Sequence, residues 1–198
     1  MMHRNALFLI VLLLINTALV YADSAANYRS KYVGQELREI KTLSKEDIDE
    51  LKNGEGWGLA KAAELNGVPG PAHLLEMKFE IQLSEKQIEQ ISDIYEKMKT
   101  DAISLGLKLI DLERELNRSF ETGEIDEESL KGLLSRISDV YAQLRYTHLS
   151  AHLKTPSILT TDQIKLYNKL RGYDLSDPCE NIPEGHDPEM WKRHNKCD

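Results

Sequence analysis

Two histidines four residues apart, His148 and His152, are the strongest candidates for chemistry in this sequence. On a helix this spacing places both imidazole rings on adjacent turns of one face, where they can reach the same metal ion. His148 also falls on an apolar stripe, where an imidazole is costly to bury unless a partner satisfies it. The pair therefore predicts a metal site, with hydrogen bonding to a carboxylate such as Glu96 as the alternative.

A second pair of donors, His73 and Met77, has the same spacing in an earlier segment. If two long helices lie antiparallel around residue 123, His148 and His152 face the first half of the earlier helix, and the segment before it comes close. We therefore expect His73, His148 and His152 to be metal ligands, with Met77 and Glu96 as further candidates. For Met77 the alternative is packing in the core. Imidazole and thioether donors suit copper, nickel, cobalt or, without the methionine, zinc.

No catalytic motif accompanies these histidines. The sequence has no HExxH motif, no phosphate-binding loop and no nucleophile on a predicted strand-to-helix turn. Gly54, Gly56 and Gly58 do not follow a predicted strand, so they do not indicate a nucleotide-binding loop. The sequence therefore predicts a protein that is not an enzyme.

Composition narrows the class of protein further. The 198 residues include 25 Lys and Arg and 33 Asp and Glu, a net charge of −8, so a basic surface for nucleic acid is not expected. Aromatic residues make up only 7% of the chain, which argues against an all-β sandwich. The length allows one main domain.

A long helix is predicted to start at Leu83-Ser84-Glu85-Lys86-Gln87, where Ser84 and Gln87 match a capping box, and to stop at Thr122-Gly123. Apolar residues recur along it at alternating spacings of three and four, which keeps them on one side of a helix. The predicted stripe consists of Ile88, Ile91, Tyr95, Met98, Ala102, Leu105, Leu109, Leu112, Leu116 and Phe120.

A second long helix is predicted from Asp126 to just before Pro156, and the short loop between the two makes them antiparallel. Its predicted stripe consists of Leu130, Leu134, Ile137, Tyr141, Leu144, His148 and Ala151. Shorter helices are predicted over 44–53, 57–66 and 71–81, and after a capping box at Thr160 and Gln163. The fold class is therefore all-α, a long antiparallel helical hairpin with short flanking helices.

The mature chain divides by composition into three parts: short helices and loops over 23–82, the hairpin core over 83–172, and a tail over 173–198. A hairpin of two amphipathic helices leaves a face that its own short helices do not cover. We therefore expect a homodimer that buries this face.

Residues 1–22 match a secretory signal peptide. Arg4 precedes the apolar run of residues 6–15, and Val20-Tyr21-Ala22 places small residues where cleavage requires them. The run is short for a membrane span, although an uncleaved anchor is the alternative. The sequence predicts export through a cleaved signal peptide.

Cys179 and Cys197 are the two cysteines of the chain. In an oxidising compartment two cysteines most often pair, so we expect a disulfide in a tail that is otherwise partly disordered. The alternative is a metal site with His186 and His194, but the spacing C-x6-H-x7-H-x2-C matches no familiar zinc pattern.

The sequence resembles the extracytoplasmic LTxxQ-motif family, which includes Spy- and CpxP-like chaperones, the zinc-resistance protein ZraP and CnrX-type heavy-metal sensors. The resemblance covers residues 70–172 and rests on Leu-Ser-Glu-Lys-Gln at 83–87 and Leu-Thr-Thr-Asp-Gln at 159–163. It implies a hooked four-helix protomer that dimerises in the periplasm. The sensors carry histidines ahead of the first long helix and a His-x3-Met pair late in the second, which His73 and the pair His148 and His152 match, with His in place of Met.

This resemblance implies a non-enzymatic periplasmic protein that binds a transition metal through histidines, in heavy-metal sensing or the envelope stress response, with a membrane sensor or regulator as a partner. The alternative is an ATP-independent holdase chaperone that binds unfolded client proteins without a specific metal site. A third reading is a structural partner of a membrane complex with no ligand.

Overall fold

The computed structural model describes residues 28–173, 178–179 and 181–197, and every regular element in these ranges is a helix. This confirms the predicted all-α class. The chain divides into two compact units, Met1–Lys41 and Thr42–Asp198. The described part of the first unit contains the single-turn helix η1 (Gln35–Leu37). The predicted signal peptide lies outside the described residues.

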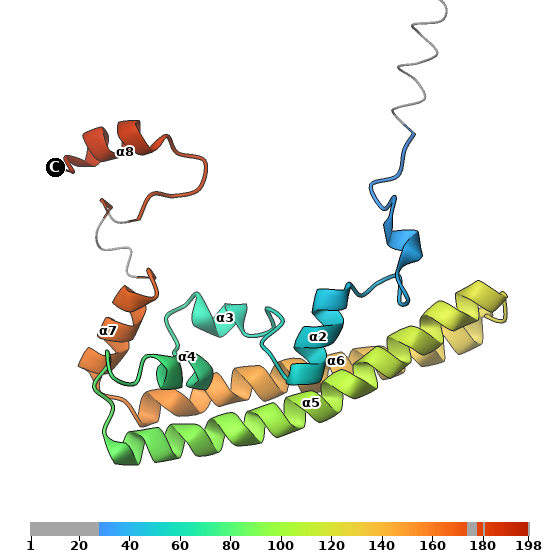
Figure 1. Cartoon of the computed structure of the whole chain (residues 1–198), viewed down its shortest axis with the longest axis horizontal. Coiled ribbons are helices and arrows are strands. Elements are labelled where there is room, and N and C mark those ends of the chain that lie inside the picture. Colours follow the sequence, from blue (N-terminus) through green and yellow to red (C-terminus); the bar gives the residue numbers. More distant parts are fainter. Residues whose placement is uncertain (1–27, 174–177, 180, 198) are drawn as a thin grey trace, which may run out of the picture. The chain divides into compact units, whose positions relative to one another are not determined.

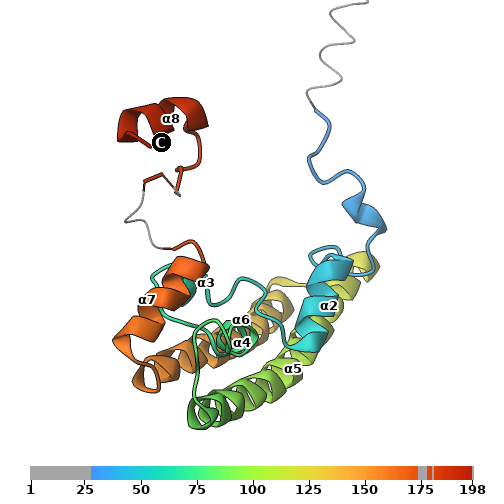
Figure 2. The same ribbon diagram turned by 60° about the vertical axis from the view of Figure 1, so that its left-hand side comes forward.

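The second unit is built on a long helical hairpin of α5 (Glu85–Thr122) and α6 (Glu127–Lys154), which lie side by side in Figures 1 and 2. α5 begins at the predicted capping box, where the backbone N–H of Gln87 donates to the Ser84 hydroxyl. It ends at Gly123, whose φ of 72° is a left-handed conformation that favours glycine. The predicted hairpin is therefore confirmed, with its helix ends at the predicted residues.

The predicted apolar stripe of α6 is wrong at two positions. Leu133 and Val140 are buried, whereas the neighbouring Leu134 and Tyr141 are 44% and 39% exposed. Each of these positions has two adjacent apolar residues, Leu133 with Leu134 and Val140 with Tyr141. Only packing against α5 decides which residue of a pair is buried. From Leu144 onward the predicted stripe is correct, so His148 is buried as expected. On α5 the last residue of the predicted stripe is not buried, because Phe120 is 60% exposed.

Helix α2 (Lys45–Asn53) packs across the middle of α5. Gly106 makes this contact close, because a Cβ at that position would collide with the backbone carbonyl of Leu51. Gly54 ends α2 with a φ of 65° and lies against α5 in the same way, since a Cβ there would lie 2.9 Å from the Lys99 carbonyl oxygen.

Helices α3 (Lys61–Glu64) and α4 (Pro71–Glu76) follow, and both are shorter than predicted. Pro71 occupies the first turn of α4, where its missing N–H costs no hydrogen bond. α4 packs on α5, and α3 packs on α6. Figure 1 shows both short helices over the half of the hairpin that lies next to α7, where α6 ends.

The chain leaves α6 through the single turn η2 (Thr155–Ser157) and enters α7 (Thr161–Leu170). A buried cluster joins α7 to α4 and to the start of α5. Its fully packed members are Leu74, Ile81, Leu83, Ile91 and Tyr167.

The glutamines of the two LTxxQ-like segments bind each other. Gln87 donates through Nε2 to Oε1 of Gln163 at 2.8 Å, and Gln163 donates back to Oε1 of Gln87 at 3.1 Å. Gln87 also donates to the Ile158 carbonyl at 2.8 Å. Each glutamine caps its own helix as well, since Oε1 accepts from the backbone N–H of Ser84 or Thr160 at 2.9 Å. The two capping boxes therefore hold the starts of α5 and α7 together.

The tail contains α8 (Pro188–Asn195), a helix that the sequence analysis did not predict. The structure has the expected disulfide between Cys179 and Cys197, which encloses this helix. The indole N–H of Trp191 donates to the Pro178 carbonyl at 2.6 Å, which ties α8 to the residue just before Cys179. The disulfide leaves no thiolate for the alternative metal site with His186 and His194.

None of the helices in the described ranges is long and apolar enough to cross a membrane. The homodimer stays a prediction of the sequence.

We expect Gln87→Ala and Gln163→Ala each to lower the free energy of unfolding by about 1–2 kcal/mol, because each removes a cap and an interhelical bond. The double variant is expected to lose about 1 kcal/mol less than the sum, since the two side chains share bonds. Urea denaturation measures these values. Gln90→Ala, on the exposed surface of α5, is the control and is expected to change little. Strict additivity of the two single variants would contradict the coupling.

Candidate functional site

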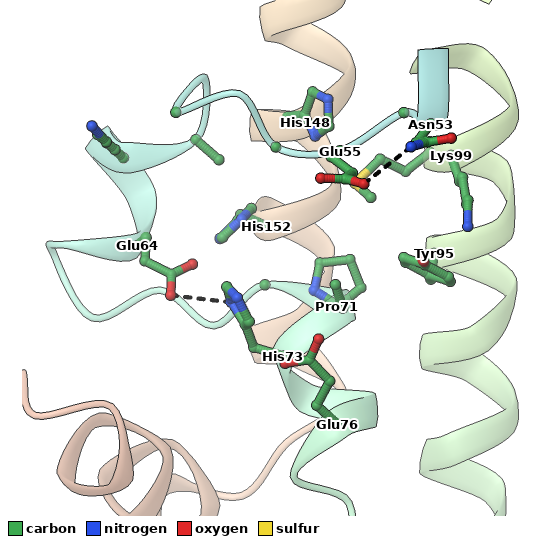
Figure 3. A pocket seen from close by; sticks show the side chains of 18 of the residues that line it. Asn53, Glu55, Glu64, Pro71, His73, Glu76, Tyr95, Lys99, His148 and His152 are labelled. Atoms are coloured by element: carbon green, nitrogen blue, oxygen red, sulfur yellow. Dashed lines mark hydrogen bonds and ion pairs between the residues drawn. The ribbon is translucent and has the colours of Figure 1, made fainter. Parts of the chain in front are cut away.

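A pocket of about 780 Å³ lies between the hairpin and the short helices packed on it. Its walls come from α2, α3, α4, α5 and α6, from the connecting segments and from the region after α7. Figure 3 shows the three imidazoles of His148, His152 and His73, with His152 between the other two in this view. The three histidines that the sequence singled out therefore line one pocket.

His148 contributes a buried ring nitrogen that lacks a partner. The side chain is 3% exposed, and Nε2 makes no hydrogen bond to any described residue. Burial, together with the neighbouring His152, lowers the pKa of His148, so the ring is neutral at pH 7. A buried polar atom without a partner costs roughly 1–3 kcal/mol, which indicates a position where a ligand is expected.

His152 is held in a defined orientation. Its Nδ1 lies 2.9 Å from the carbonyl oxygen of Val68, and a carbonyl can only accept, so Nδ1 carries the proton. In the neutral ring Nε2 then carries the lone pair. Gly70 lies directly against this edge of the ring, because a Cβ there would lie 2.7 Å from Cε1 and 2.8 Å from Nε2. The absence of a side chain at Gly70 therefore leaves room for this ring.

His73 is oriented in the same way by a carboxylate. Its Nδ1 lies 3.2 Å from Oε1 of Glu64, as the dashed line in Figure 3 marks. Because an ionised carboxylate only accepts, Nδ1 of His73 donates, and in the neutral ring the lone pair is on Nε2. Metal-binding histidines typically show this arrangement, in which one ring nitrogen donates to a carboxylate or carbonyl and the other faces the ion.

Glu64 accepts more bonds than any other side chain described at the pocket. Its Oε1 accepts from Tyr167 and Tyr173 at 3.1 Å and from Arg171 at 2.8 and 3.1 Å, besides His73. Burial raises the pKa of Glu64, but the bonds from His73 and Tyr173 and the charges of His73 and Arg171 outweigh it and lower the pKa to about 2. Glu64 is therefore a fixed anion that joins α3, α4 and α7.

The structure does not bring the two remaining candidates to the pocket. Met77 packs against the buried cluster around Leu74, which is the alternative that the sequence left open. Glu96 is exposed on α5 and is not among the pocket-lining residues. Within the described part of the chain, no group of three or more His, Cys, Asp or Glu side chains is arranged to hold a metal ion. His148, His152 and His73 therefore share a pocket without forming a closed set of ligands.

Several residues of the pocket were not predicted from the sequence as site residues. Glu64 and Arg171 are charged residues 107 positions apart, and nothing in either local sequence signals that they pair. Met98 was predicted only as part of the apolar stripe, yet it also lines the pocket beside Tyr95 and Lys99. The register of the hairpin was the signal for Tyr95, Met98 and Lys99, because it placed the start of α5 opposite His148 and His152.

The fold and the pocket define an all-α protein in which a long helical hairpin and its short packed helices enclose a histidine-lined pocket. Comparisons with protein-family models, with curated proteins and with solved structures find no match. The resemblance to the LTxxQ-motif family stays a prediction that rests on residues 83–87 and 159–163.

We expect the contribution of Glu64 to stability to depend on pH. Its pKa in the folded protein, about 2, lies below the ordinary value of 4.5, so the stabilisation is present above pH 4.5 and is lost as the pH falls toward 2. A shift of this size corresponds to roughly 3 kcal/mol. Glu64→Gln should therefore be clearly less stable than the wild type at pH 7, and the gap should narrow by about 2–3 kcal/mol on approaching pH 2.5.

Urea denaturation at a series of pH values measures this gap. Glu76→Gln is the matched control, because Glu76 lines the same pocket but accepts none of the bonds that Glu64 accepts. A gap between wild type and Glu64→Gln that stays constant from pH 7 to pH 2.5 would show that Glu64 is not held as an anion.

Proposed function

We propose that this protein is a non-enzymatic, exported protein that binds a transition-metal ion through His148, His152 and His73 and acts in metal handling or the envelope stress response. The observation that carries the proposal is the buried Nε2 of His148, which has no partner among the described residues and lies one helical turn from His152. At this spacing both Nε2 atoms can reach one ion.

The state of the three rings supports the proposal. A metal ligand must be a neutral imidazole, and burial keeps His148 neutral. Val68 and Glu64 accept from Nδ1 of His152 and His73, so in the neutral form of each ring the lone pair is on Nε2. Neutral imidazole donors suit zinc, copper and nickel.

The position of the ligands also supports the proposal. His148 and His152 are on the long helix α6, which packs against α5, whereas His73 is on the short helix α4. Two ligands therefore come from a long helix of the hairpin, and the third comes from a short helix packed on it. A third ligand that approaches when the ion binds would couple occupancy of the site to the position of α4.

We expect the purified, untagged protein to bind one transition-metal ion, and His148→Ala or His152→Ala to weaken binding at least about tenfold, because each removes one of the few protein ligands. Isothermal titration with copper, nickel, cobalt and zinc measures the affinity. His194→Ala is the control, since His194 is exposed on α8 in the tail. No saturable binding, or equal affinity in all variants, would refute the metal site.

A second variant tests the site without removing a histidine. Gly70→Ala places a methyl group against Cε1 and Nε2 of His152, so the ring must move away from the Val68 carbonyl. We expect metal affinity to fall about tenfold or more and the free energy of unfolding to fall by about 1–3 kcal/mol. Gly56→Ala is the matched control, because Gly56 lines the same pocket and a Cβ there meets no described atom within 4 Å. Equal affinity of Gly70→Ala and the wild type would place the ion elsewhere.

A further inference from the structure

We infer that the pocket takes the metal ion together with a small organic polycarboxylate that chelates it, so that the ligand is a metal–carboxylate complex. This inference rests on the proposed function and names the form in which the ion is bound. Three features of the pocket carry it: its volume, the incomplete set of protein ligands, and the basic side chains on its walls.

The volume is far larger than an ion needs. A water molecule takes up about 30 Å³, so an ion with three waters needs on the order of 100 Å³. The pocket measures about 780 Å³, which lies in the range of about 300–1,000 Å³ typical of sites for organic molecules. Much of the pocket would therefore remain filled by solvent around a bare ion.

The protein ligands leave coordination positions open. His148, His152 and His73 supply at most three nitrogen donors, and among the described residues no group of three or more His, Cys, Asp or Glu side chains is already arranged to hold an ion. Nickel, cobalt and copper take four to six donors, so several must come from other molecules. A chelating carboxylate supplies two or three oxygen donors at once and loses less entropy than separate ligands.

Three lysines on the walls can bind the carboxylate groups that do not contact the ion. Lys52, Lys61 and Lys99 line the pocket, and within the described ranges none of them forms an ion pair. With Arg171 and the three glutamates of the lining, the pocket carries a net charge of +1, although the chain carries −8. A pocket with a net positive charge in a negatively charged chain attracts an anionic ligand.

Two of these lysines have defined neighbours at the pocket wall. The ammonium group of Lys99 lies 5.5 Å from the centre of the Tyr95 ring, and Figure 3 shows both side chains extending from α5 at the pocket. The Nζ of Lys61 lies 3.5 Å from where a Cβ of Gly58 would be. The absence of a side chain at Gly58 gives this ammonium group room at the pocket wall.

Equilibrium dialysis with radiolabelled citrate tests the inference directly. Three samples contain the untagged protein with Co²⁺ alone, with citrate alone, or with an equimolar mixture of the two, and bound cobalt and bound citrate are both counted. We expect cobalt and citrate to be retained together in equal amounts from the mixture. Lys61→Gln and Lys99→Gln should each lower citrate retention about tenfold without changing the retention of Co²⁺ supplied alone. Lys131→Gln, exposed on α6, is the control.

The other outcomes separate this inference from the proposed function. If Co²⁺ is retained and citrate only removes it, the inference is overturned and the metal site stands. If citrate is retained equally with and without Co²⁺, the pocket is a site for an organic acid and the inference is again overturned. If neither is retained, both proposals fail.

Discussion

The pocket depends on how three consecutive backbone groups are held. Nδ1 of His152 donates to the Val68 carbonyl, the Thr155 hydroxyl donates to the Pro69 carbonyl at 2.6 Å, and the Gly70 N–H donates to the Tyr167 hydroxyl at 3.4 Å. All three side chains are buried, so water cannot compete for these bonds. The segment before α4 is thereby fixed on the end of α6, and the position of His73 follows from it. The same His152 ring both anchors this segment and lines the pocket.

Much of the fold could be predicted because its signals are local. The capping box at Ser84 and Gly123 mark the two ends of α5. Apolar residues at alternating spacings of three and four indicate which face of the helix is buried. The errors occur where local signals are degenerate. Leu133 and Leu134 are both apolar, so only the packed partner decides between them. Helix α8 was missed because a helix of eight residues with few apolar side chains has little periodicity to detect.

Less of the site could be predicted, and the reason is the sequence separation of its parts. His148, His152 and His73 were found because each pair of donors has a helical spacing and the register of the hairpin brings the pairs together. The groups that orient them were not found. The Val68 carbonyl is a backbone atom with no sequence signature, and Glu64 binds partners about 100 positions later. Hydrogen bonds of this kind depend on the completed tertiary structure.

Gly70 and Gly106 offer a way to recognise this arrangement of helices in distantly related sequences. At Gly70 any side chain would overlap an imidazole, and at Gly106 it would overlap the backbone of another helix. Neither residue has a left-handed φ, so neither glycine serves to make a turn. Evolutionary change at Gly70 therefore requires the His152 ring to move, and change at Gly106 requires α2 to shift away from α5. A diverged chain that keeps both glycines at the same distance from its capping boxes is expected to keep this arrangement of helices, even where little else of the sequence is alike.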